Sequence, residues 1–221
     1  MQAEMEGAFH IAFYVAELVG REEAGGLTRA QQQLLRLLTP VMKLTTAKQA
    51  VLVASETLEA FGGAGYVEDT GLPVLLRDSQ VLPIWEGTTN VLALDALRVM
   101  AREAGAFAAL AAEAQRCAAE ARAEQLIQAA RLATEAVAHA ETWLAAATKG
   151  GQPTLEAGAR RLALTLGRAL SLALLVSHAQ WSLDYEQDAR AAAAAKRYAQ
   201  AGIDLIVPAG VDDALALMND R

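Results

Sequence analysis

Glu86 has the sequence setting that best suits chemistry, because it lies between Trp85 and Gly87 just before a predicted helix. A carboxylate beside an indole and other apolar residues can have its pKa raised by desolvation, which suits it to abstract a proton. Gly87 would let a ligand approach the backbone closely. An acid near a helix N-terminus also interacts favourably with the helix dipole. The position of Glu86 is therefore compatible with a general base and with a purely structural role.

Other reactive residue types lack the partners that their chemistry needs. His10, His139 and His178 lie on separate predicted helices with no second ligand at metal-binding spacing, so we expect no metal site. Cys117 has no neighbouring base, and we expect it to be a small packing residue. The glycine-rich run at 62–65 follows a helix rather than a strand and begins no helix, which favours a helix C-cap over a phosphate-binding loop.

Helices must position these residues. Apolar residues at three- and four-residue spacing predict helices over 1–23 and 28–61, the second of which Pro40 should break or kink. Residues 62–87 are punctuated by Gly and Pro and keep no helical period, so we expect a long, irregular and functional loop. Helix resumes near residue 88, and further helices are predicted over 103–148, 154–183, 186–205 and 211–219.

The composition favours an all-α helical bundle. The chain is 54% hydrophobic but only 5% aromatic, and its abundant alanine packs well in helices and poorly on a sheet. The sequence becomes alanine-rich near residue 103, which predicts a helical domain over 1–102 followed by an alanine-rich helical extension over 103–221.

Charge and cysteine content exclude several classes of protein. The net charge of −7 argues against nucleic-acid binding, and Arg160, Arg161 and Arg168 are interpreted as a solvated helix face. The single cysteine indicates a reducing compartment. The acidic N-terminus does not resemble a secretory signal, and Arg168 interrupts the strongest apolar run. These features predict a cytoplasmic protein that does not enter a membrane.

Two motifs resemble the C-terminal helical domain of the acyl-CoA dehydrogenases. The first, LEAFGGAGY at 58–66, is similar to the family's Gln-x-x-Gly-Gly-x-Gly-Tyr/Phe segment. The second, Arg-Asp at 77–78 followed by IWEGTTN at 84–90, is similar to the family's Arg-Asp and Ile-Tyr-Glu-Gly-Thr segments. Their order and separation also agree. The chain departs from the usual pattern at Glu59, where many members have Gln, and at Trp85, where Tyr is common.

The resemblance implies FAD-dependent oxidation of an acyl-CoA to a 2,3-enoyl-CoA, a reaction of fatty acid metabolism. Glu86 would remove the α-proton while the β-hydride passes to the flavin, and Trp85 and Gly87 would border the thioester. Thr88 and Asn90 would lie near the FAD. The residues expected to contact the FAD of a neighbouring subunit are Glu59, Phe61, Gly62 and Gly63.

The same resemblance implies a homodimer or homotetramer and an acceptor similar to electron-transfer flavoprotein. Glu59, Trp85 and the alanine-rich extension are most similar to the alkylation-response branch of the family. The flavin-holding domains of the family do not precede Met1, so we expect a C-terminal fragment with an incomplete FAD site and no activity of its own.

Two alternatives remain at this point. One is a non-catalytic helical oligomerisation or scaffold module, because the small residues of the second half allow close helix packing. The other is a nucleic-acid-binding alkylation-response protein, which the acidic charge balance disfavours.

Overall fold

The computed structural model describes residues 1–208 and 211–218, and these contain helices but no β-strand. The all-α prediction is therefore confirmed. The α-helices are α1 Gln2–Glu23, α2 Arg29–Ala60, α3 Leu72–Ser79, α4 Thr89–Arg102, α5 Ala106–Ala118, α6 Glu124–Lys149, α7 Gln152–Trp181, α8 Arg190–Gln200 and α9 Val211–Met218. Short 3-10 turns, η1 Gly62–Gly65 and η2 Glu68–Thr70, follow α2, and a π-helical turn, η3 Ser182–Glu186, follows α7.

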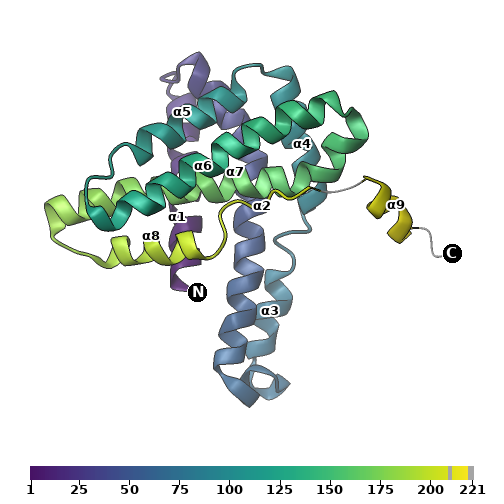
Figure 1. Cartoon of the computed structure of the whole chain (residues 1–221). Coiled ribbons are helices and arrows are strands. Elements are labelled where there is room, and N and C mark those ends of the chain that lie inside the picture. The colour runs from purple at the N-terminus through teal and green to yellow at the C-terminus, as the bar shows by residue number, and fades with distance from the viewer. Residues whose placement is uncertain (209–210, 219–221) are drawn as a thin grey trace.

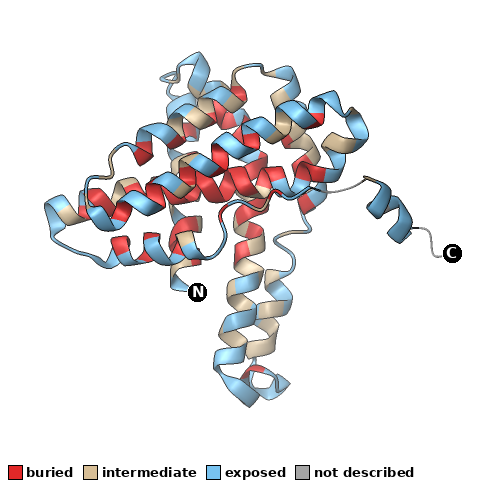
Figure 2. Ribbon diagram, viewed as in Figure 1, coloured by how far each residue is buried: buried red, intermediate tan, exposed pale blue. Residues whose placement is uncertain are grey.

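The chain forms a body and a projecting arm (Figure 1). In the body, α7 contacts α1, α2, α4, α5, α6 and α8, so it is the central helix. The arm consists of residues 51–81, in which the end of α2 and the short α3 lie side by side. Figure 2 shows buried positions throughout the body and few in the arm, where Gly65 is the single buried residue.

Leucines of α7 and alanines of its neighbours make the core of the body. Leu162, Leu166 and Leu170 are fully buried. The small side chains of α5, α6 and α8 let these helices approach α7 closely. One hydrophobic cluster contains residues from both sides of residue 103, so the two predicted domains share a core; their boundary stays a prediction.

The continuous segment Gln152–Glu186 is long and apolar enough to cross a membrane by length and composition alone. However, 78% of its most apolar 18-residue window is buried inside this protein. A core helix satisfies the same criteria as a membrane span, so the apolar surface of α7 is accounted for by its packing.

Tertiary contacts override two of the local helix predictions. Pro40 does not break α2, because Leu37, Leu38 and Val41 are fully buried on either side of it and hold the helix in place. The helix predicted over 103–148 is divided into α5 and α6. The Gln180 side-chain oxygen accepts hydrogen bonds of 2.8 Å from the backbone N–H groups of Arg122 and Ala123, which stabilise the turn between them.

The two remaining differences lie at 62–87 and 186–205. The stretch predicted to lack helix contains the eight-residue α3. The helix predicted over 186–205 is confined to α8, because the π-helical turn ends at Gln187 with positive φ and the backbone leaves the helix after Gln200.

A buried ion pair ties four helices together. The Arg168 guanidinium donates hydrogen bonds of 2.8 and 3.1 Å to the two carboxylate oxygens of Glu4, and both residues are 8% exposed. The Gln49 amide donates to Glu4 at 2.8 Å, and the Arg168 guanidinium lies 4.7 Å from the ring centre of Tyr198. Burial opposes ionisation of Glu4, but the bonds from Arg168 and Gln49 outweigh it and lower the pKa of the carboxyl. The predicted solvated position of Arg168 was therefore wrong.

Candidate functional site

A groove of about 490 Å³ runs between α1, α2 and the loop that precedes α4. Its walls are mostly apolar, and Glu86 and Lys43 supply its charged groups. The lining residues are Met5, Ala8, Phe9 and Ala12 of α1, Lys43, Thr46, Ala47 and Ala50 of α2, and Leu82, Trp85 and Glu86 of the loop. Concave, largely apolar sites with a few polar groups are typical of small-molecule binding.

Glu86 lies at the edge of this groove with an unusual backbone conformation. Its φ of 52° is in the left-handed region, which non-glycine residues adopt rarely and at a cost in energy. Gly87 follows with φ 105°, and a Cβ there would lie 3.0 Å from the Leu92 side chain. The two residues together make a sharp turn that leads into α4.

The predicted desolvation of Glu86 is not found in this chain. Glu86 is exposed, and Trp85 is 54% exposed beside it. The described residues form one apolar side of the surroundings of Glu86, but they do not enclose its carboxylate. Any desolvation of Glu86 has to come from atoms outside the described chain.

The start of α4 places two further predicted residues beside this loop. Thr88 is the N-cap residue of α4, although its hydroxyl makes no capping hydrogen bond. Asn90 is exposed, and its side-chain oxygen accepts a hydrogen bond of 3.4 Å from Arg160 of α7. Trp85, Glu86, Gly87, Thr88 and Asn90 are therefore brought together, and we call them the loop group.

The other predicted residues lie at the tip of the arm. Gly62 has φ 57° directly after the end of α2, which agrees with the predicted glycine C-cap. A Cβ built on Gly62 or Gly63 would meet nothing within 4 Å, so their backbone is open to approach. Glu59 is exposed and Phe61 is 55% exposed. Glu59, Phe61, Gly62 and Gly63 form the arm-tip group.

The two groups do not meet within one chain. The helical rise places residue 59 about 24 Å along α2 from residue 43, which contacts the loop group. A ligand that touches the arm-tip group of one chain would therefore have to be long, or would meet the loop group of another chain.

Lys43 was not among the predicted site residues. Its ammonium donates hydrogen bonds of 2.7 Å to the backbone carbonyls of Trp85 and Gly87. A lysine in mid-helix has no local signature of such a contact. Its position 42 residues before Trp85 could not be interpreted without the fold.

The discounted residues Cys117, His10 and His178 do not line the groove. Cys117 is fully buried, and burial together with the Glu113 carboxylate raises its pKa to about 12, so it stays a thiol. The fold does bring His10 and His178 together, with ring centres 4.7 Å apart. Across the described residues, no group of three or more His, Cys, Asp or Glu could hold a metal ion.

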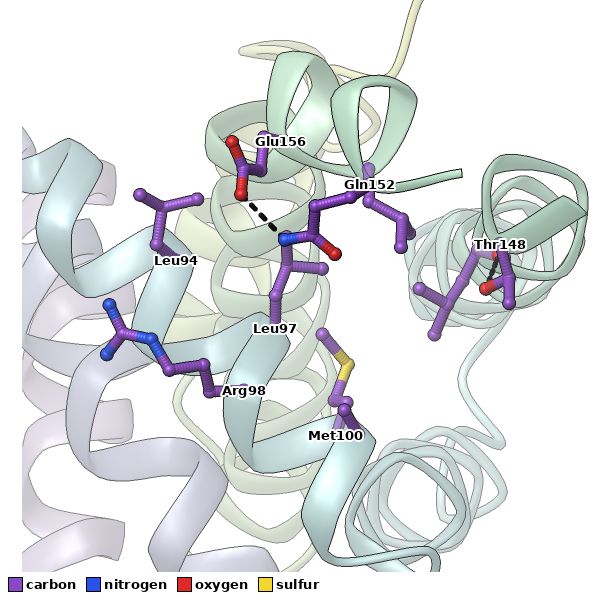
Figure 3. Close-up of a pocket in the computed structure, with 10 residues that line it drawn as sticks. Leu94, Leu97, Arg98, Met100, Thr148, Gln152 and Glu156 are labelled. Carbon is purple, nitrogen blue, oxygen red and sulfur yellow. Dashed lines mark hydrogen bonds between the residues drawn. The ribbon is translucent and has the colours of Figure 1, made fainter. Parts of the chain in front are cut away.

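A second cavity, of about 320 Å³, lies between α4 and the junction of α6 with α7 (Figure 3). The polar side chains around it are already paired. The Gln152 amide donates to Glu156 at 2.6 Å, Arg98 donates to Asp95, and the Thr148 hydroxyl donates to the Leu144 carbonyl. None of the predicted site residues lines this cavity.

Two family models match this chain, one over each part of it. Residues 1–101 match the family model described as acyl-CoA dehydrogenase, C-terminal domain. Residues 1–101 are therefore similar to a C-terminal domain of the acyl-CoA dehydrogenase family. A second family model matches the extension. Residues 105–211 match the model described as acyl-CoA dehydrogenase 11 C-terminal domain-like.

Two curated relatives match this chain over different lengths. Acyl-CoA dehydrogenase family member 11 of Caenorhabditis elegans is 40% identical over 184 residues, which cover 81% of this chain and 30% of that protein. 3-Methylmercaptopropionyl-CoA dehydrogenase of Ruegeria pomeroyi is 41% identical over 96 residues, which cover 42% of this chain and 16% of that protein. The chain thus spans less than a third of the length of either curated relative.

A solved structure matches the whole chain. The crystal structure of Caenorhabditis elegans ACDH-11 in complex with C11-CoA superposes with a TM-score of 0.89 at 35% identity, covering 100% of this chain and 39% of that one. The predicted closeness to the alkylation-response branch is not supported. The alanine-rich extension, which was part of that prediction, instead matches the acyl-CoA dehydrogenase 11 type.

Proposed function

We propose that this chain supplies the base-carrying part of an FAD-dependent acyl-CoA dehydrogenase. Glu86 would abstract the α-proton of an acyl-CoA, and Trp85 and Gly87 would border the thioester. The observation that carries the proposal is the apolar groove that has Glu86 at its edge, in a domain of this family. The C11-CoA bound to ACDH-11 favours an acyl-CoA as the ligand.

Most of the predicted FAD-binding residues are placed so that they could contact a flavin cofactor, but one of them opposes it. The open backbone of Gly62 and Gly63 would admit a diphosphate, and Thr88 and Asn90 are exposed beside the loop. Glu59 is an exposed acid and opposes an anionic group at the same place. When bound, FAD would supply the acceptor for the β-hydride, and an electron-transfer-flavoprotein-like protein would then reoxidise it.

The separation of the two groups supports a proposal about assembly. The arm-tip group of one subunit would contact the FAD that lies against the loop group of a neighbouring subunit, in a homodimer or homotetramer. We propose further that the enzyme acts in the cytoplasm, in fatty acid metabolism. Because the chain spans 30% of its relative, flavin binding would need the remainder of such an enzyme.

Substitution of Glu86 tests the proposed base. In the full-length enzyme, Glu86→Gln should lower acyl-CoA dehydrogenation by about 10²–10⁴-fold, the usual contribution of a general base, while the flavin absorbance near 450 nm stays unchanged. Glu68→Gln, at an exposed acid of the arm, should keep full activity. Undiminished turnover in Glu86→Gln would exclude Glu86 as the base.

A scaffold role is the competing function, and the exposed apolar side chains of the arm are the observation that favours it. The two functions predict different results for flavin absorbance and for acyl-CoA turnover. A full-length protein that forms a stable oligomer, binds no FAD and does not oxidise acyl-CoA would fit the scaffold. Flavin absorbance that is bleached by acyl-CoA would fit the dehydrogenase.

A further inference from the structure

Lys43 holds the loop on both sides of Glu86. Its Nζ atom donates to the Trp85 carbonyl oxygen and to the Gly87 carbonyl oxygen, each at 2.7 Å. These distances are typical of the strong hydrogen bonds made by a charged donor. One ammonium therefore bridges the two peptide groups that flank the proposed base.

The backbone of Glu86 needs such a constraint. A left-handed φ at a residue with a side chain is strained and persists only where the surroundings enforce it. The turns before Glu86 are closed by hydrogen bonds from the N–H groups of Ile84 and Trp85 to the Val81 carbonyl, at 2.9 and 3.0 Å. Within the described chain, Lys43 is the side chain that hydrogen-bonds to the backbone of residues 84–88.

The direction of the Glu86 side chain depends on that backbone. Lys43 also lines the groove, as Glu86 does, and it extends from α2, whose middle is anchored in the core by Leu44. A rigid helix thereby sets the position of a loop that has few contacts of its own. We propose that Lys43 is a positioning residue, which orients the Glu86 carboxylate over the groove through the carbonyls of Trp85 and Gly87.

This inference rests on the proposed function, since it assigns Lys43 to the base at position 86. A displaced base slows proton abstraction without removing the substrate-binding surface, because small errors in geometry cost large factors in rate. Loss of Lys43 should therefore lower kcat and leave KM nearly unchanged. A merely structural role would instead lower the amount of folded, flavin-containing enzyme.

The test uses the full-length enzyme with three variants. Lys43→Met keeps an unbranched side chain and removes the donors, and we expect kcat to fall at least 10-fold with KM within about 2-fold. Lys43→Arg keeps charged donors and should recover most of the kcat. Lys48→Met is the matched control, because Lys48 is a half-buried lysine of the same helix that lines a different cavity and should keep the wild-type kcat.

Two further measurements separate this inference from the proposed function. With an α-deuterated acyl-CoA, the kinetic isotope effect of Lys43→Met should exceed that of wild type, because proton abstraction becomes slower than the other steps. Hydrogen exchange of the Ile84 and Trp85 amides, which donate to the Val81 carbonyl, should also accelerate at least 10-fold. If Lys43→Met does not fold, Lys43→Leu removes the donors in the same way.

The outcomes are distinct. An inactive Glu86→Gln together with a fully active Lys43→Met or Lys43→Leu overturns the positioning role alone. A fully active Glu86→Gln overturns the proposed base, and the role of Lys43 in catalysis falls with it. Equal losses of kcat in the Lys43 and Lys48 variants would show a general effect on α2 and would also contradict the inference.

Discussion

The body and the arm use similar helices, but they are stabilised very differently. The body is held by the fully buried leucines of α7 and by the Glu4–Arg168 pair. In the arm, Gly65 is the single buried residue, and Phe61, Tyr66 and Leu75 are each more than half exposed. The residues proposed to contact the FAD of a neighbouring subunit are thus carried by the part of the chain that buries least. The arm leaves apolar surface for something outside this chain to cover.

Removal of Glu4 should have the largest effect on stability and should act on the body. Glu4→Ala leaves Arg168 buried without its partner, which typically costs about 3–5 kcal/mol of the free energy of unfolding. Urea unfolding followed by circular dichroism measures this loss. Glu17→Ala is the control, because its exposed pair with Arg21 at 3.6 Å should contribute less than about 1 kcal/mol. Similar losses in both variants would contradict the importance given to the buried pair.

Addition of one methyl group at the arm tip should destabilise the arm and leave the stability of the body unchanged. A Cβ at Gly65 would lie 2.1 Å from the Leu58 carbonyl oxygen, so Gly65→Ala should loosen the arm tip by about 1–3 kcal/mol. Gly63→Ala is the matched control, since its Cβ would meet nothing within 4 Å. Hydrogen exchange should accelerate at Tyr66 and Val67, whose amides donate to the Gly63 carbonyl, while α7 is unchanged. Faster exchange throughout α7 would mean that arm and body unfold as one unit.

The smallest expected effect is a dependence of the free energy of unfolding on pH, which comes from His10 in the body. Burial, together with the neighbouring His178, lowers the pKa of His10 to about 4, and Glu6 opposes the shift. Between about pH 6.5 and 4 the unfolded chain binds a proton at His10 that the folded chain does not, so stability falls as the pH falls. After allowance for solvent screening, the loss is about 1–2 kcal/mol.

His10→Gln should remove this part of the dependence in urea unfolding at a series of pH values. The lowered pKa of Glu4 acts at lower pH, below its ordinary value of 4.5, where protonation weakens the pair with Arg168. An unchanged slope between pH 6.5 and 4.5 in His10→Gln would contradict the assignment to His10.

Local sequence determined the helices, their main breaks and the two motifs. Apolar spacing and alanine content act between residues a few positions apart, so α1, α4 and α7 could be predicted, as could the glycine that ends α2. The grouping of Trp85 to Asn90 could also be predicted, because these residues are neighbours in the chain.

Tertiary structure decided what those elements contact. Arg168 meets Glu4 across 164 positions, Lys43 meets the loop across more than 40, and Gln180 divides α5 from α6 across 57 and 58. No local pattern encodes such pairs, because each depends on how whole helices pack. Packing also decided that the Glu86 carboxylate is exposed in this chain. It decided as well that the arm stands apart from the body. Both outcomes depend on which surfaces the helices of the body cover.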